Sequence, residues 1–202
     1  MDLDLTAVAK ARAIVLVEGM SDKAALDVLA QRLRIPTGGT GIHIVPMGGV
    51  TNVGRYIDAF GPGGLGISLT GLCDAGEADY VVRILARAGF VVDDSRAGLA
   101  ALGFYVCDAD LEEELIRAAG VGAVERIIEA QGEIGSFRTF VKQPAQRLRS
   151  PEQHLHRFMG TRSGRKSLYA SLLAEALELP CVPEPLMRVL AHAAQPVPVK
   201  RT

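Results

Sequence analysis

The 202-residue chain has 49% hydrophobic and 22% charged residues, which is typical of a folded globular protein with its own core and excludes a disordered chain. No apolar run approaches the ~18 residues of a membrane-spanning helix, so we expect no membrane partner. Acidic residues outnumber basic ones by 19 to 11 over residues 1–136, whereas basic residues prevail by 11 to 4 over residues 137–202. This asymmetry predicts a site that gathers cations beside a surface that attracts anions, although chance clustering of solvated charges would give the same counts.

The first two thirds of the chain alternate between short apolar runs and helical patterns. A helix is predicted between Ser21 and Pro36, where apolar residues recur at helical spacing. Further helices are predicted at Val50–Phe60 and Ala75–Ala88, and strands at Ala13–Val17, Ile42–Val45, Leu65–Cys73 and Leu102–Cys107. Strands that alternate with helices predict an α/β fold, with a parallel sheet covered by helices on both faces.

From Leu111 onward the strand pattern disappears. Helices are predicted at Leu111–Ala119, Val121–Gln131, Pro151–Met159, Ser163–Leu177 and Pro185–Ala194, and the segment 136–151 shows no clear periodicity. We therefore expect an α/β core over residues 1–135, a basic helical extension over 136–195 and a disordered tail over 196–202.

Acidic residues follow three of the predicted strands. Ligands of open α/β sheets bind beyond the carboxyl ends of the strands, so these acids should meet at one edge. Converging carboxylates repel each other unless a hard divalent cation neutralises them. Each acid alone could instead be an ordinary residue of a helix N-terminus, but three strand ends together favour a site for Mg²⁺ or Mn²⁺. The candidate metal ligands are Glu18, Asp22, Asp74, Asp110 and Glu112, with Glu77, Asp108 and Glu113 as substitutes or supporting groups.

The segment Val17–Asp22 resembles the opening glutamate motif of the TOPRIM domain, which topoisomerases, primases, small maturation nucleases and the OLD (overcoming lysogenization defect) nucleases share. The resemblance implies that Glu18 binds Mg²⁺ together with an Asp-x-Asp pair after a later strand. Asp74 matches the first aspartate of that pair, but Gly76 stands in the place of the second. Gly19 should let the backbone turn tightly between Glu18 and Asp22.

The OLD branch of this family is the most similar. Its features are the position of Asp22 in the first motif, the segment Asp110–Glu112 before a helix, and the segment Ser163–Lys166 at the start of a late helix. The resemblance extends over roughly residues 13–190 and implies that Lys166 stabilises charge on the scissile phosphate. OLD nucleases usually carry an N-terminal ABC-type ATPase. This chain has no room for one, so we expect a stand-alone TOPRIM domain whose ATPase, if it needs one, is a separate protein.

The segment Gly160–Ser167 superficially resembles an ATP-binding P-loop. That motif needs a glycine before its lysine, where this chain has Arg165, and no buried strand precedes the segment, so we reject ATP binding. Instead, we expect Ser163 to cap a helix whose N-terminus, together with Arg162 and Arg165, binds a phosphodiester. Lysine suits the role proposed for Lys166 because it is a compact point charge. An ordinary solvated basic helix start is the alternative.

Other chemistries have weak support. His154 and His156 are two residues apart, so on one helix they point to different sides and cannot chelate an ion as a pair. Neither Ser21 nor Ser163 has histidine and aspartate partners at a recognisable spacing, which argues against a serine hydrolase. Three widely spaced cysteines fit neither a disulfide framework nor a zinc ribbon, and the acidic N-terminus lacks a secretory signal, so we expect a cytoplasmic protein.

The leading hypothesis from the sequence is a Mg²⁺- or Mn²⁺-dependent endonuclease that binds the DNA backbone and hydrolyses it, with little sequence preference and strong salt dependence. One alternative is a non-catalytic or partner-activated TOPRIM module that binds nucleic acid and works with a separate ATPase. A weaker alternative is an RNA-maturing nuclease. The sequence leaves open whether two copies form a homodimer.

Overall fold

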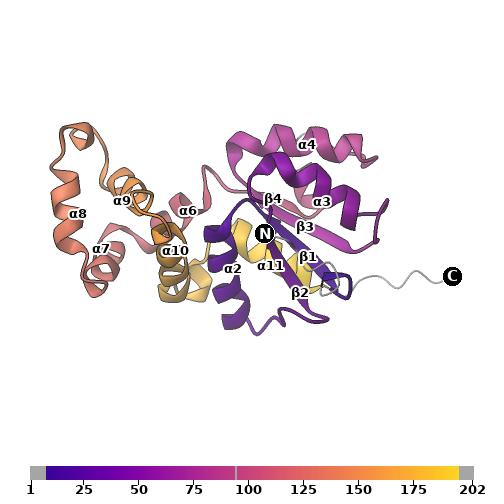
Figure 1. The fold of residues 1–202 in the computed structure, drawn as a ribbon, viewed down its shortest axis with the longest axis horizontal. Helices are drawn as coiled ribbons and strands as arrows, with labels where there is room; N and C mark the ends of the chain where they lie inside the picture. Colours follow the sequence, from indigo (N-terminus) through magenta and orange to yellow (C-terminus); the bar gives the residue numbers. More distant parts are fainter. Residues whose placement is uncertain (1–7, 94, 196–202) are drawn as a thin grey trace.

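The computed structural model describes residues 8–93 and 95–195, so the predicted tail at 196–202 lies outside the described residues. Four parallel strands form one sheet in the order β2-β1-β3-β4. Their bounds are β1 Ala13–Val17, β2 Ile42–Pro46, β3 Ser68–Cys73 and β4 Phe104–Val106. Helices cover both faces of this sheet (Figure 1), which confirms the predicted parallel α/β fold.

Strand β1 lies at the centre of the sheet and is buried along its whole length. Its residues alternate between two hydrophobic clusters: Ile14 and Leu16 pack on one face, and Val15 and Val17 on the other. Val15 lies opposite Ile44 of β2. This register brings the carboxyl ends of β1, β2 and β3 to the same edge of the sheet.

Each face of the sheet has its own set of helices. One face is covered by α3 (Val53–Phe60), α4 (Ala78–Arg87) and α5 (Arg96–Ala101). The other is covered by α2 (Met20–Arg32), α10 (Arg165–Ala176) and α11 (Glu184–Ala194). Short 3-10 turns lie at η1 (Val50–Asn52), η2 (Ala75–Glu77), η3 (Pro144–Gln146) and η4 (Leu179–Cys181).

A helical arm extends from this edge of the sheet. It begins at α6 (Leu111–Ala119) and continues through α7 (Val121–Ala130), α8 (Ile134–Val141) and α9 (Pro151–Met159). Figure 1 shows α7, α8 and α9 lying away from the sheet, whereas α10 returns to pack along α2, and α11 packs against β1, β3 and β4. Part of the predicted extension, 136–195, thus completes the α/β core, while the boundary at residue 135 stays a prediction.

Two helices were not predicted from the sequence. α5 is only six residues long and lies in a segment rich in alanine and glycine. α8 depends on contacts with α9, because the Phe137 ring packs edge-on against Phe158 with ring centroids 5.2 Å apart. Short helices of this kind are set by tertiary packing more than by local periodicity. In the described parts of the chain, no helix combines the length and the apolar character that spanning a bilayer requires.

Candidate active site

The turn after β1 presents two of the predicted carboxylates. Glu18 follows the buried strand directly, and Asp22 lies in the first turn of α2, where its Oδ2 accepts a hydrogen bond of 2.7 Å from the backbone N–H of Gly19. The backbone N–H groups of Gly48 and Gly49, in the loop after β2, donate to the carbonyl oxygen of Glu18 at 3.0 and 3.1 Å. These bonds hold the turn against the neighbouring strand end.

The predicted reason for Gly19 is wrong. Its backbone is extended, with φ −140° and ψ −172°, a conformation that any residue adopts. A Cβ placed there would approach no atom more closely than the Asp22 Oδ2 at 3.9 Å. The turn between Glu18 and Asp22 therefore does not require glycine.

The end of β3 supplies the second part of the site. Asp74 follows the strand, and Glu77 closes the η2 turn one residue beyond Gly76. Glu18, Asp74 and Glu77 each offer a carboxylate oxygen, and these three oxygens lie within 4.8 Å of one another. We call these three residues the sheet-side carboxylates. Glu77 thus brings a carboxylate to the place where the TOPRIM resemblance led us to expect the second aspartate.

The end of β4 leads into α6, which supplies the third part. Asp110 caps α6, because its Oδ1 accepts a hydrogen bond of 2.8 Å from the Glu113 N–H. Its Oδ2 lies 2.6 Å from the Nε2 of His156, on α9. Glu112 is buried in the first turn of α6, with its side chain 5% exposed. We call Asp110, Glu112 and His156 the α6–α9 cluster; one ligand atom from each lies within 4.8 Å of the others.

Lys166 reaches the same place from the first turn of α10. Its Nζ lies 3.5 Å from Glu112 Oε2, and its side chain is 46% exposed. The side chain therefore places a positive charge at the rim of the carboxylates while keeping access to solvent.

These side chains surround one hollow of about 380 Å³ at the carboxyl edge of the sheet. The hollow is lined by Glu18, Gly19, Ser21, Asp22, Gly48, Gly49, Asp74, Asp110, Glu112 and Lys166. All five carboxylates predicted as metal ligands and the predicted catalytic lysine thus lie together. Their roles stay predictions, because the geometry places the groups and does not test what they do.

The other predicted substrate-binding residues lie outside this hollow. The side chain of Arg165 is only 5% exposed, and its guanidinium pairs with Glu133 at 2.6 Å and lies over the Phe158 ring. Arg162 is exposed, 3.6 Å from the same glutamate, beside Ser163 in a separate hollow. The prediction that Ser163 caps α10 is wrong, because the helix begins at Arg165 and its N-cap is Gly164.

Two of the acids predicted as substitutes or supporting groups, Asp108 and Glu113, also lie outside this hollow. Asp108 is exposed and pairs with Arg96 at 2.8 Å and with Arg117 at 3.2 Å. Glu113 faces a neighbouring hollow that lies against α9. The sequence does not predict His156 as part of the site, because its spacing from His154 gives no chelating pair. Its contact with Asp110 joins residues 46 positions apart, which no local pattern signals.

Electrostatics differ between the two sides of the hollow. Burial, reinforced by the charges of Glu18 and other nearby acids, raises the pKa of Asp74 to about 7 and that of Glu77 to about 7. Burial also raises the pKa of Asp22 to about 6, against the hydrogen bond from the Gly19 N–H. Asp110 behaves differently. Although its burial acts to raise its pKa, the hydrogen bonds from His156 and from the Glu113 N–H hold that pKa below its usual value.

Comparisons with known proteins agree with this arrangement. Residues 11–75 match the family model described as "Overcoming lysogenization defect protein-like, TOPRIM domain". This part of the chain is therefore similar to the TOPRIM domain of OLD-like proteins. The TOPRIM match includes Glu18, Asp22 and Asp74, whereas the α6–α9 cluster and Lys166 lie beyond it. No curated protein matches the sequence.

Solved structures extend the likeness beyond the TOPRIM segment. The C-terminal region of the Xanthomonas campestris pv. campestris OLD protein matches with a TM-score of 0.70 and 24% identity, over 91% of this chain and 95% of that one. The C-terminal region of the Burkholderia pseudomallei OLD protein matches with a TM-score of 0.70 and 22% identity, over 91% and 97%. The TOPRIM segment and the helices that follow it thus share the fold of these C-terminal regions, which confirms the resemblance inferred from the sequence motifs.

Proposed function

We propose that this chain is an endonuclease that hydrolyses DNA phosphodiester bonds with Mg²⁺ or Mn²⁺. The observation that carries the proposal is the meeting of five predicted carboxylate ligands and Lys166 in one hollow at the carboxyl edge of the sheet. The likeness to the OLD-like TOPRIM domain supports a nucleic-acid substrate and a metal-dependent reaction.

The carboxylates in and beside the hollow fit a divalent cation. Two buried carboxylate oxygens, Glu112 Oε1 and Glu77 Oε2, have no hydrogen-bond partner among the described residues. An unpaired buried carboxylate oxygen is costly, and a hard cation that prefers oxygen ligands would satisfy it. Glu18, Asp22 and Asp74 would hold an ion on the sheet side, with Glu77 as an added ligand. Asp110 and Glu112 would hold an ion on the α6 side.

The protein's own groups would divide the work. A bound divalent ion supplies Lewis-acid chemistry, which activates water and offsets the charge of the phosphate. Lys166 would place its ammonium against the phosphate oxygens as negative charge builds up on them. Because its Nζ is only 3.5 Å from Glu112 Oε2, the lysine stands beside the proposed ligands without replacing one of them.

The DNA backbone would contact Lys166 and exposed basic side chains that lie outside the hollow. Residues 137–202 hold half of the lysines and arginines of the chain but few acids, and several of these basic side chains are exposed on the helical arm and before α10. Contacts of this kind read phosphates, not bases, so affinity should fall steeply with salt and vary little with sequence. The exposed basic residues nearest in sequence to Lys166 are Arg157 and Arg162.

Plasmid cleavage tests the proposal. The purified chain is incubated with supercoiled DNA in Mg²⁺, Mn²⁺ or EDTA, beside Lys166→Met and a matched control, Lys10→Met, whose lysine is exposed and lies outside the hollow. We expect metal-dependent nicking that Lys166→Met reduces at least ~100-fold and that Lys10→Met keeps.

A folded chain that binds Mn²⁺ but cleaves neither DNA nor RNA would overturn the proposal. That result would point instead to the non-catalytic or partner-activated module, which is consistent with Gly76 in the position of the second aspartate. Cleavage of duplex RNA in preference to DNA would assign the site to RNA maturation.

A further inference from the structure

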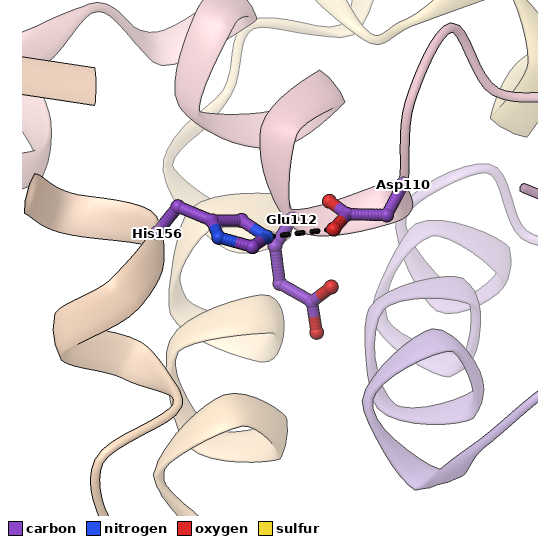
Figure 2. Close-up of side chains that lie close together, drawn as sticks. All are labelled: Asp110, Glu112 and His156. Atoms are coloured by element: carbon purple, nitrogen blue, oxygen red, sulfur yellow. Dashed lines mark hydrogen bonds and ion pairs between the residues drawn. The ribbon is translucent and has the colours of Figure 1, made fainter. Parts of the chain in front are cut away.

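Among the described residues, His156 is the one imidazole in the two groups of side chains that could hold a metal ion, and the other members of both groups are carboxylates. It comes from α9, in the helical arm, and its Nε2 lies 2.6 Å from Asp110 Oδ2 (Figure 2). The imidazole is half-buried, and its outer side borders a second hollow of about 450 Å³ along α9. His156 thus borders this second hollow, whereas Asp110 and Glu112 line the first one.

Glu112 gives an independent sign that the cluster takes a ligand. Its side chain is 95% buried, one of its carboxylate oxygens faces Lys166, and the other, Oε1, has no partner in the described residues. One ligand atom of Glu112 lies within 4.8 Å of ligand atoms from both Asp110 and His156. A cation among the three would satisfy the unpaired oxygen.

The donor set separates this cluster from the sheet-side carboxylates. Glu18, Asp74 and Glu77 offer oxygen alone, which suits Mg²⁺. The α6–α9 cluster offers two carboxylates and an imidazole, and an imidazole nitrogen favours first-row transition-metal dications over Mg²⁺. The two sides of one hollow thus differ in the chemistry of the ion that they select.

We propose that Asp110, Glu112 and His156 form a mixed nitrogen–oxygen site that selects a transition-metal dication such as Mn²⁺ over Mg²⁺, with His156 as the residue that sets this preference. The inference rests on the proposed function in one respect, because both treat Asp110 and Glu112 as metal ligands. It adds that the two sides of the hollow hold different ions when both metals are present.

Metal binding tests this inference without any reading of cleavage. Mn²⁺ is titrated into the metal-free chain in the presence of a hundredfold excess of Mg²⁺, and the bound ion is examined by pulsed electron paramagnetic resonance for coupling to an imidazole nitrogen. We expect a Mn²⁺ ion that resists the excess of Mg²⁺ and shows this coupling.

Three variants separate ligation from support. His156→Asn should lose the nitrogen coupling and reduce the preference for Mn²⁺ over Mg²⁺ at least tenfold. His156→Asp supplies an oxygen in place of the nitrogen, so it should keep affinity for both ions but lose the preference. His154→Asn is the matched control, because His154 lies on the same helix and bonds the backbone oxygen of Gln146 at 2.8 Å; it should change neither property.

The inference is overturned if wild-type protein shows no nitrogen coupling, or if His156→Asn weakens Mg²⁺ and Mn²⁺ equally, which would make His156 only a support for Asp110. These results are distinct from a failure of the proposed function. Nitrogen-coupled Mn²⁺ in a chain that cleaves nothing would leave this site standing and remove the nuclease. Cleavage without nitrogen coupling would do the reverse.

Discussion

The sheet-side carboxylates and the α6–α9 cluster line or adjoin the same hollow, but only the α6–α9 cluster has positively charged groups of the chain beside its carboxylates. Around Glu18, Asp74 and Glu77, no lysine or arginine of the described residues comes within ion-pair distance, and the pKa values of Asp74 and Glu77 rise to about 7. Within the α6–α9 cluster, His156 contacts Asp110 and Lys166 lies beside Glu112, and the pKa of Asp110 falls below its usual value. One group is arranged to be completed by a cation from outside, whereas the other is partly neutralised by the chain itself.

The largest expected effect comes from removing charge on the sheet side. Glu18→Gln keeps the shape of the side chain but removes one ligand of the proposed ion, so the metal-dependent cleavage rate should fall ~1000-fold. The change should not reduce stability, because it also removes a charge from a group of repelling acids. Cleavage rates and urea unfolding would be measured together, with the exposed Glu129→Gln on α7 as the control. Full activity in Glu18→Gln would remove Glu18 from the site.

Arg165 and Lys166 are adjacent on α10, but substitution of the first should affect stability and substitution of the second should affect cleavage. Arg165→Met should lower the free energy of unfolding by about 3 kcal/mol, because it removes one partner of a largely buried ion pair with Glu133. Lys166→Met should leave stability nearly unchanged, since Lys166 is half-exposed, yet should lose cleavage. Urea denaturation separates the two. A stable Arg165→Met chain with weak DNA binding would instead support the predicted contact of Arg165 with substrate.

The pH dependence of stability should have opposite signs for the carboxyl groups with raised pKa values and for Asp110, whose pKa is lowered. For Asp22, Asp74 and Glu77, the raised pKa values mean that the folded state binds more protons than the unfolded state between about pH 4 and pH 7. Their ionisation therefore destabilises the metal-free protein as pH rises through this window. Asp110, with its lowered pKa, stabilises the fold above pH 4 and loses that contribution in more acid solution.

Thermal unfolding in EDTA tests this sign. The melting temperature should rise by a few degrees when the pH falls from 8 to 5.5, and Mg²⁺ or Mn²⁺ added at pH 8 should recover most of the difference. Glu77→Gln should flatten the pH dependence. A metal-free protein that is less stable at pH 5.5 than at pH 8 would contradict the conclusion that ionisation of Asp22, Asp74 and Glu77 destabilises the fold.

The smallest effect is expected for an acid that follows β4 but lies outside the hollow. Asp108 is exposed and its side chain pairs only with Arg96 and Arg117 among the described residues, so Asp108→Asn should change the free energy of unfolding very little and leave cleavage unchanged. Its measurement serves as the reference for Asp110→Asn, two residues later, which should impair both Mn²⁺ binding and cleavage. If both variants bind Mn²⁺ and cleave DNA equally well, a side chain that lines the hollow matters no more than one that merely follows the strand.

The sequence predicted the sheet and the side of it that carries the acids, because both depend on local patterns. Buried strands are short apolar runs, and parallel strands must end at a common edge, so Glu18, Asp74 and Asp110 could be brought together without coordinates. Lys166 was placed by resemblance to OLD nucleases alone. Nothing in its local pattern says that α10 folds back against α2.

The rest could not be predicted because it depends on the direction of single side chains and on distant contacts. Arg165 and Lys166 are adjacent and alike in charge, but one turns toward Phe158 and Glu133 and the other toward Glu112. His156 reaches Asp110 only when α9 packs against α6. Glu77 was a reserve candidate, and its helical spacing from Asp74, three residues, was the available signal.

The site combines residues from the beginning and from the end of the chain, because α10 and α11 pack back against the first part of the fold. Glu18 and Asp74 leave the ribosome early, while Lys166 and the apolar residues of α11 that cover β1 and β3 leave late. A nascent chain would therefore lack the lysine until α10 has emerged, and one face of its sheet would stay partly uncovered until α11 has emerged. A polypeptide interrupted before α10 would carry the early acids of the site without Lys166 and without the helix that packs on that face of the sheet.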